Sequence, residues 1–318
     1  MDIHTIYALV GFLLASYAVI GNDSVQTLGT FMASNNRVFK WYVLWAAACS
    51  VLIVTILWGW YSSGTGDISH GRLDKIPYVP VQWYHAAAPL VLVVLTRYGL
   101  PVSTTFLVLS TFASTVVLES MLVKSIIGYI VAAIFSYVLW IVLSRVLNEK
   151  KTKVKQEHRA IWRTLQWIST GFLWYTWLSH DMANIAVFLP RSLDLPHLAL
   201  AIIVPCAWLA YIFKSKGGEI QKIVLDKTGT RFMRSATIID FVYAFILLFF
   251  KEYNNVPMST TWVFVGVLCG RELAICTVHR QSYKFKYVFP IVGKDFLKMM
   301  FGLAISVAIV LLIHYVLS

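Results

Sequence analysis

The stretch Pro101–Thr105 reads Pro-Val-Ser-Thr-Thr, and the stretch Pro257–Thr261 repeats it as Pro-Met-Ser-Thr-Thr. A proline followed by hydroxyl residues and then by an apolar run is typical of the start of a helix, with serine as the N-cap. The first turn of a helix offers free backbone N–H groups and the positive end of the helix dipole, and the hydroxyl groups add further donors. The two stretches therefore predict two helix starts suited to binding an anion.

The composition predicts a polytopic membrane protein. The chain has 318 residues, of which 58% are hydrophobic and only 13% are charged, and soluble domains do not have such a ratio. The net charge of +12 comes from basic residues in short loops between apolar runs. That distribution sets membrane orientation and argues against nucleic-acid binding. The four cysteines lie in apolar segments without metal-ligand spacing, so neither disulfides nor a metal site are expected.

Apolar segments in the first half predict helices over residues 4–20, 41–62, 84–100 and 122–146, with a further helix from Ser103 to about 118. The polar stretch Gly21–Ser24 interrupts the first of them at membrane depth. Residues 25–35 are too short to span, because a crossing needs about 20 residues. These residues are therefore expected to form a broken or re-entrant segment.

The second half repeats this order after a basic linker at residues 147–160. Helices are predicted over residues 161–178, 196–213, 236–251 and 295–317, with a break at Ser179–Asp181, a short segment up to Pro190 and a helix after Ser259. Ser103 lies 80 residues after Asp23, and Ser259 lies 78 residues after Asp181. Polar markers in the same order at the same spacing predict an internal repeat, with one membrane repeat at residues 1–146 and the other at 161–318.

The basic loops predict the orientation. If the segments after the two breaks do not cross the membrane, one side receives the loops at residues 36–40, 147–160, 214–235 and 279–294. By the positive-inside rule this side is cytoplasmic and both termini lie outside, in a plasma (inner) membrane. The halves then enter from opposite sides. The predicted fold is an all-α polytopic membrane protein with two inverted-topology repeats, whose broken or re-entrant helices meet at a midplane site as in secondary transporters.

The duplicated polar motifs resemble those of the inorganic phosphate transporter (PiT) family of cation–phosphate symporters. That family carries two copies of Gly-Ala-Asn-Asp-Val-Ala-Asn-Ala and two copies of Pro-Val/Ile-Ser-Thr-Thr-His. In the first half, Asn22 and Asp23 match the Asn-Asp pair, and Gln26 stands at the second Asn. In the second half, Asp181 and Asn184 match.

The chain departs from the family pattern at several positions. His180 replaces the first Asn of the second copy, and the family's histidine after Ser-Thr-Thr is Phe106 in one half and Trp262 in the other. These departures indicate a divergent branch, in which the transported oxyanion could differ.

The resemblance and the chemistry of the residues together predict a site for phosphate and a coupling cation. The residues expected to bind phosphate are Asp23, Ser103, Thr104, Thr105, Asp181, Ser259, Thr260 and Thr261. The residues expected to bind a coupling cation are Asn22, Asp23, Gln26, His180, Asp181 and Asn184. The family implies Na⁺ or H⁺ coupling and often a homodimer in the lipid bilayer. No other cofactor, no further metal and no catalytic residue is expected.

Structural roles remain open for the same side chains. The aspartates could cap a broken helix, the Ser and Thr residues could serve only as N-caps, and the amides could hydrogen-bond between helices. Arg271 and Glu272 interrupt an apolar helix and, as sequence neighbours, are not expected to pair. Asp240 lies near a predicted helix end, so an interfacial position is expected.

These features predict a secondary active transporter that moves inorganic phosphate with Na⁺ or H⁺ by alternating access, and not an enzyme. A permease for sulfate or another oxyanion on the same fold is an alternative. Buried carboxylates favour phosphate, because near neutral pH it keeps a proton to donate. A membrane-embedded enzyme acting on a phosphorylated lipid or sugar, and a sensor that binds without transport, are the alternatives from other classes.

Overall fold

The computed structural model describes residues 2–97, 102–147, 158–215, 233–278 and 285–313. Pro101 lies outside the described residues. So do most of the basic linker, most of the loop predicted at 214–235, and residues 279–284 of the loop predicted at 279–294.

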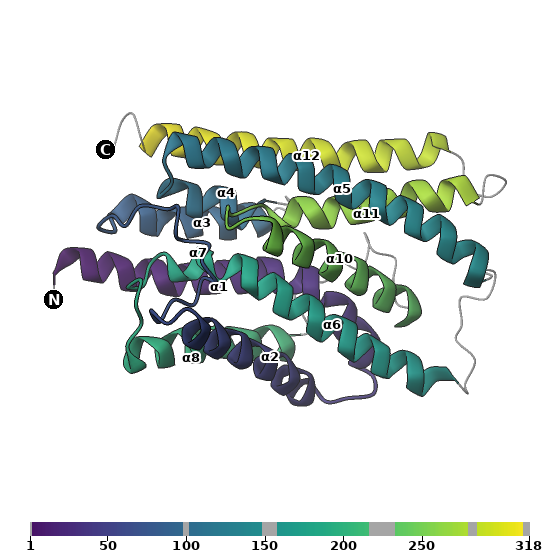
Figure 1. Ribbon diagram of the computed structural model, residues 1–318, viewed down its shortest axis with the longest axis horizontal. Helices are drawn as coiled ribbons and strands as arrows, with labels where there is room; N and C mark the ends of the chain where they lie inside the picture. Colours follow the sequence, from purple (N-terminus) through teal and green to yellow (C-terminus); the bar gives the residue numbers. More distant parts are fainter. Residues whose placement is uncertain (1, 98–101, 148–157, 216–232, 279–284, 314–318) are drawn as a thin grey trace.

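The described chain is helical throughout its regular structure, as predicted. The first half contains α1 (Ile3–Asn35), α2 (Trp41–Ser62), α3 (Trp83–Arg97), α4 (Thr104–Leu107), the 3-10 turn η1 (Leu109–Thr111) and α5 (Thr115–Leu147). The second half contains α6 (Arg159–Asp181), α7 (Ala183–Ala186), α8 (Leu195–Lys214), α10 (Met233–Tyr253), α11 (Thr260–Val278) and α12 (Phe285–Leu312). Six helices are long and apolar enough to cross a membrane, and they run along the long axis of the bundle (Figure 1).

The helix α1 does not break where the sequence predicted. It continues as one helix of 33 residues through Gly21–Ser24, so residues 25–35 are not a separate re-entrant segment. Its polar side chains bond back to the helix: the Ser24 hydroxyl donates to the Ile20 carbonyl, and the Thr27 hydroxyl donates to the Asp23 carbonyl. Such bonds satisfy polar groups without unwinding the backbone. In the second half, α6 does end at Asp181 and a one-turn α7 follows.

Two helical hairpins reach toward the centre from opposite ends of the bundle (Figure 1). Both α3 and α4 lie in the half that contains the N-terminus, whereas α10 and α11 lie in the other half. The described part of α3 has 15 residues and covers all but the last three residues of the span predicted at 84–100, which lie outside the described residues. The helix predicted from Ser103 to 118 is wrong, because α4 has only four residues.

Two further boundaries differ from the predictions. The helix α5 begins at Thr115, earlier than the expected residue 122. The helix α12 begins at Phe285, ten residues before the expected start at 295.

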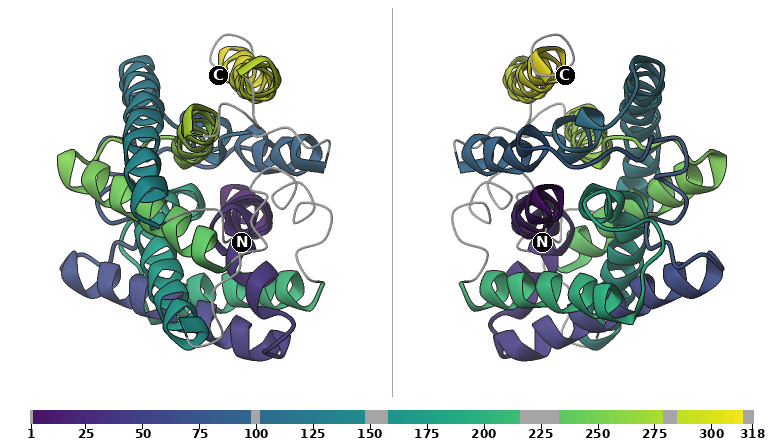
Figure 2. Two further views of the ribbon diagram at one scale, coloured as in Figure 1. Left: turned by 90° about the vertical axis from the view of Figure 1, so that its right-hand side faces the viewer. Right: turned by 90° about the vertical axis from the view of Figure 1, so that its left-hand side faces the viewer.

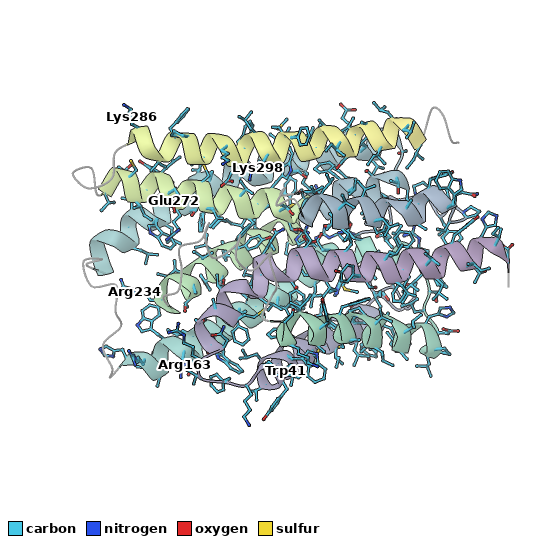
Figure 3. The ribbon with its side chains drawn as sticks, turned by 180° about the vertical axis from the view of Figure 1, so that it is seen from behind. Trp41, Arg163, Arg234, Glu272, Lys286 and Lys298 are labelled. Carbon is cyan, nitrogen blue, oxygen red and sulfur yellow. The ribbon has the colours of Figure 1, made fainter. Side chains whose placement is uncertain are left out.

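The end views place α1 near the middle of the bundle, with α2 and α8 on one side and α12 on the other (Figure 2). Corresponding helices of the two halves run in opposite directions in Figure 1: α1 leads away from the N-terminal end, and α6 leads back toward it. Arg163, Arg234 and Lys286 lie at the end of the bundle opposite the N-terminus (Figure 3). The inverted repeat that these directions suggest stays a prediction.

Gly266 and Gly270 bring α11 very close to α5. A Cβ atom built on Gly266 would lie 2.5 Å from the carbonyl oxygen of Tyr129, and one on Gly270 would collide with the carbonyl of Ala133. Ser136 on α5 also donates to the Val267 carbonyl at 2.8 Å. Small residues four positions apart are what lets membrane helices approach closely, so this contact depends on both glycines.

We expect Gly270→Ala to lower the free energy of unfolding by about 1–3 kcal/mol, because the added methyl group must push α5 and α11 apart. Thermal unfolding of the detergent-purified protein measures the effect. Gly293→Ala on α12 is the matched control, since nothing lies within 4 Å of its Cβ position. Both variants gain helix propensity, so equal transition temperatures would contradict the tight contact.

Candidate anion and cation site

Asp23 lies on α1 and is completely buried. Its Oδ1 atom accepts hydrogen bonds from the side-chain amide of Asn22 at 2.7 Å and from the side-chain amide of Gln26 at 3.4 Å. Its Oδ2 atom accepts from the Thr104 hydroxyl at 2.8 Å. The structure thus brings the three predicted cation-binding residues of the first half together with one predicted phosphate-binding residue.

Asp181 is the last residue of α6 and is also completely buried. Its Oδ1 atom accepts from the Thr105 hydroxyl at 3.1 Å and from the Asn184 amide at 2.8 Å. The Thr260 side chain also interacts with this carboxylate. Predicted residues from both Ser-Thr-Thr stretches therefore surround the second aspartate.

The single turn of α4 joins the two halves. Thr104 binds Asp23 from the first half, while its neighbour Thr105 binds Asp181 from the second half. The Asn184 amide adds contacts of 3.2 Å to the Thr104 hydroxyl and 3.4 Å to the Thr105 hydroxyl. Residues that are 158 positions apart in the sequence, Asp23 and Asp181, therefore share one hydrogen-bonded cluster.

Both serines of the repeated stretch act as caps, as predicted. The Ser103 hydroxyl accepts from the Phe106 N–H at 3.2 Å, and the Ser259 hydroxyl accepts from the Trp262 N–H at 3.2 Å. The rings of Phe106 and Trp262, which stand where the PiT pattern has histidine, pack with their centroids 5.7 Å apart. Two aromatic rings thus contact one another across the halves beside the cluster.

Four buried polar atoms of the predicted site have no hydrogen-bond partner among the described residues. They are His180 Nδ1, Asp181 Oδ2, Asn184 Oδ1 and Thr261 Oγ1. Buried polar groups are nearly always paired, and exceptions point to strain or to a bound ion or ligand. Carboxylate and amide oxygens are ligands for hard cations, and a hydroxyl group can serve a cation or an anion.

His180 is oriented toward α10. Its Nε2 atom lies 2.8 Å from the Leu247 carbonyl. A carbonyl only accepts, so Nε2 carries the proton and Nδ1 is left as a buried acceptor. Within the described chain Nδ1 has no hydrogen-bond partner.

Two expectations outside the main cluster are wrong. Asp240 is not interfacial: it is 1% exposed, and it accepts from Thr170 at 2.6 Å and from Thr30 at 2.9 Å. Arg271 and Glu272 do pair, with Nη1 of Arg271 at 2.9 Å from Oε1 of Glu272. Sequence reasoning also did not single out Arg72, a completely buried loop residue, because nothing in its local sequence marks it as buried.

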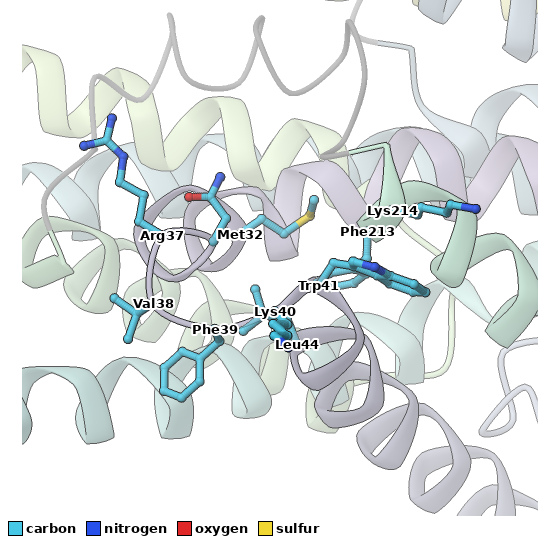
Figure 4. Close-up of a pocket in the computed structure, with 10 residues that line it drawn as sticks. Met32, Arg37, Val38, Phe39, Lys40, Trp41, Leu44, Phe213 and Lys214 are labelled. Carbon is cyan, nitrogen blue, oxygen red and sulfur yellow. The ribbon is translucent and has the colours of Figure 1, made fainter.

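A separate pocket of about 280 Å³ lies near the C-terminal end of α1. Arg37, Lys40 and Lys214 are among its lining residues, and Trp41 and Leu44 are further members (Figure 4). None of the predicted site residues lines it. The pocket belongs to the region where α1 and α8 end and α2 begins.

Comparisons with known proteins bear on the fold and on the resemblance to a family. No family model matches the chain. A Pyrococcus furiosus protein named "Putative phosphate permease" is 25% identical over 219 residues, which cover 61% of this chain and 52% of that protein. The chain thus spans about half the length of the curated relative it matches. A solved structure titled "The sodium-dependent phosphate transporter" superposes with a TM-score of 0.60 over 99% of this chain and 100% of that chain, at 15% identity.

The chain has the fold of that phosphate transporter. Together with the duplicated motifs, the two comparisons support the resemblance to the PiT family. The chain thus resembles the PiT family and departs from its motif pattern at several positions.

We expect Thr170→Val to lower the free energy of unfolding by about 1–3 kcal/mol, because the buried carboxylate of Asp240 loses a hydrogen-bond donor. Thr164→Val is the matched control on the same helix, since that exposed hydroxyl bonds only to the Ala160 carbonyl. Denaturant or thermal unfolding of both variants measures the difference. If the two variants had the same stability, the Asp240 contacts would contribute nothing.

Proposed function

We propose that this protein is a secondary active transporter that carries inorganic phosphate across a membrane together with Na⁺. The observation that carries the proposal is the convergence of Asp23 and Asp181 on the neighbouring hydroxyls of Thr104 and Thr105 in one buried cluster. The names of the permease relative and of the sodium-dependent structural neighbour support it. They also favour transport over a membrane-embedded enzyme.

The chemistry of the cluster suits a partly protonated oxyanion and a cation. Near neutral pH phosphate keeps at least one proton, which it can donate to a carboxylate, while its other oxygens accept from hydroxyl and amide groups. Sulfate has no such proton, and two carboxylates would repel it. Na⁺ is the natural partner of the unpaired oxygens of Asp181 and Asn184, and its charge would offset the repulsion between the carboxylates and the anion.

The proposed cycle is alternating access. The site residues Asp23, Thr104, Asp181 and Thr260 are at most 1% exposed, so a substrate reaches them only after a movement. The hairpins α3/α4 and α10/α11 enter from opposite ends (Figure 1), and displacement of either would open one end of the site. This use of the two halves, 1–146 and 161–318, assumes the inverted repeat.

The placement in the cell follows the same proposal. The end of the bundle with Arg163, Arg234 and Lys286 would face the cytoplasm of a plasma (inner) membrane, with both termini outside. H⁺ in place of Na⁺, and assembly as a homodimer, are the further features that the PiT resemblance implies.

Purified protein in proteoliposomes should take up labelled phosphate when a Na⁺ gradient is imposed, and excess unlabelled sulfate should not compete. A proton gradient alone is the second arm. Uptake driven only by a proton gradient would show that H⁺, and not Na⁺, is the coupling ion. Phosphate uptake blocked by sulfate would favour a permease for oxyanions in general. Phosphate binding without uptake under either gradient would indicate a sensor.

We expect Asp23→Asn and Asp181→Asn each to reduce uptake at least a hundredfold, because each removes the charge that holds the cation and accepts the phosphate proton. The side chains are nearly isosteric, so the fold should survive. Glu119→Gln, at an exposed position on α5, is the control and should transport normally. Normal rates in both aspartate variants would reject this site.

A further inference from the structure

Arg72 lies in the loop between α2 and α3, outside every motif that the sequence singled out, and its side chain is completely buried. Nη1 donates to the main-chain carbonyl of Asn254 at 2.6 Å. Asn254 directly follows α10, in the segment that leads into Ser259 and α11. Nε and Nη2 of Arg72 have no hydrogen-bond partner in the part of the chain that the structure describes. An unpaired buried donor is costly, so this edge of the guanidinium requires an acceptor.

The unpaired edge has the geometry of an oxyanion ligand. Nε and Nη2 point their N–H groups to the same side of the planar guanidinium, and such a fork binds two oxygens of a carboxylate or phosphate in parallel. Burial lowers the pKa of Arg72 to about 10, although the carboxylates of Asp181 and Glu252 act in the opposite direction. Arg72 therefore remains cationic at neutral pH.

The charge of Arg72 acts on the candidate site. The guanidinium interacts electrostatically with the carboxylate of Asp181, whose Oδ2 atom also has no hydrogen-bond partner. The two groups attract each other without a direct hydrogen bond. A ligand that both accepts and donates hydrogen bonds can satisfy both, and hydrogen phosphate is such a ligand.

Two other basic side chains are held mainly by backbone carbonyls. Lys124 on α5 donates to Asn254 O at 2.9 Å, Asn254 Oδ1 at 2.7 Å and Val256 O at 2.7 Å, so all three of its hydrogens are used. Arg191 holds the other end of the α2–α3 loop by donating to the carbonyls of Ile76 and Pro77. Its Nη1 atom also has no hydrogen-bond partner among the described residues, but its acidic neighbours are Asp67 and Asp74, and not the aspartates of the site.

We propose that Arg72 is an anion-binding residue of the transport site, and that its Nε–Nη2 edge binds two oxygens of a tetrahedral oxyanion while Asp181 accepts the proton of a third. The inference rests on the proposed function and adds a guanidinium to a site otherwise built from carboxylates, amides and hydroxyls. It assigns distinct roles to the two charges. Arg72 binds phosphate and sulfate alike, whereas Asp181 distinguishes them.

Calorimetric titration of the purified full-length protein with inorganic phosphate, in saturating Na⁺, tests the inference. We expect Arg72→Gln to raise the Kd for phosphate about ten- to a hundredfold, because a charged two-bond contact is lost. Arg72→Lys keeps the charge and the reach to Asn254 but loses the fork, and it should weaken binding about five- to tenfold. Arg191→Gln, the matched loop control, should stay within twofold of wild type.

The variants separate this inference from the proposed function. If Arg72→Gln does not fold, Arg72→Lys decides, and wild-type affinity in Arg72→Lys would then overturn the inference. Wild-type affinity in a folded Arg72→Gln would also overturn it while leaving phosphate transport intact. If the wild-type protein binds no phosphate, both proposals fail. Titration with sulfate adds a second readout. Asp181→Asn should lower the ratio of the Kd for sulfate to the Kd for phosphate, whereas Arg72→Gln should leave this ratio unchanged.

Discussion

Two carboxylates buried in the apolar interior of a membrane protein are the constraint around which this structure is arranged. An ionised group there is expensive unless donors or a counter-ion surround it. Thr104 and Thr105 supply donors to both carboxylates from one turn of helix. Adjacent residues of a helix point about 100° apart, so neighbouring hydroxyls can reach Asp23 on α1 and Asp181 on α6 together. A longer regular helix is not required, and α4 is only one turn.

The rings of Phe106 and Trp262 form the apolar side of the cluster. Each follows a Ser-Thr-Thr stretch directly, and they meet across the two halves. Electrostatic interactions are stronger in apolar surroundings than in water. Where the PiT pattern has two histidines, this chain therefore places apolar rings beside the buried carboxylates of Asp23 and Asp181.

The sequence predicted the membrane class, the helices α2, α6 and α8 to within a few residues, and the grouping of both duplicated motifs. These succeeded because apolar length and the polar motifs are local signals. It failed at Gly21–Ser24, where side-chain bonds to backbone carbonyls keep α1 continuous despite the polar residues. It also failed for the helix predicted from Ser103 to 118, because the apolar composition of this stretch does not show that the helix stops after one turn. The burial of Arg72 and of Asp240 could not be predicted, since it depends on segments distant in the sequence.

The glycine contact between α5 and α11 has a consequence for biogenesis. The two helices belong to different halves, and Gly266 and Gly270 are more than a hundred residues downstream of the α5 surface that they cover. During synthesis, α5 enters the lipid before α11 has been made, because the linker, α6, α8 and α10 come first in the chain. The first half therefore cannot reach its final packing alone. A chain arrested before α11 would present an unmatched helix surface to the quality-control machinery of the membrane.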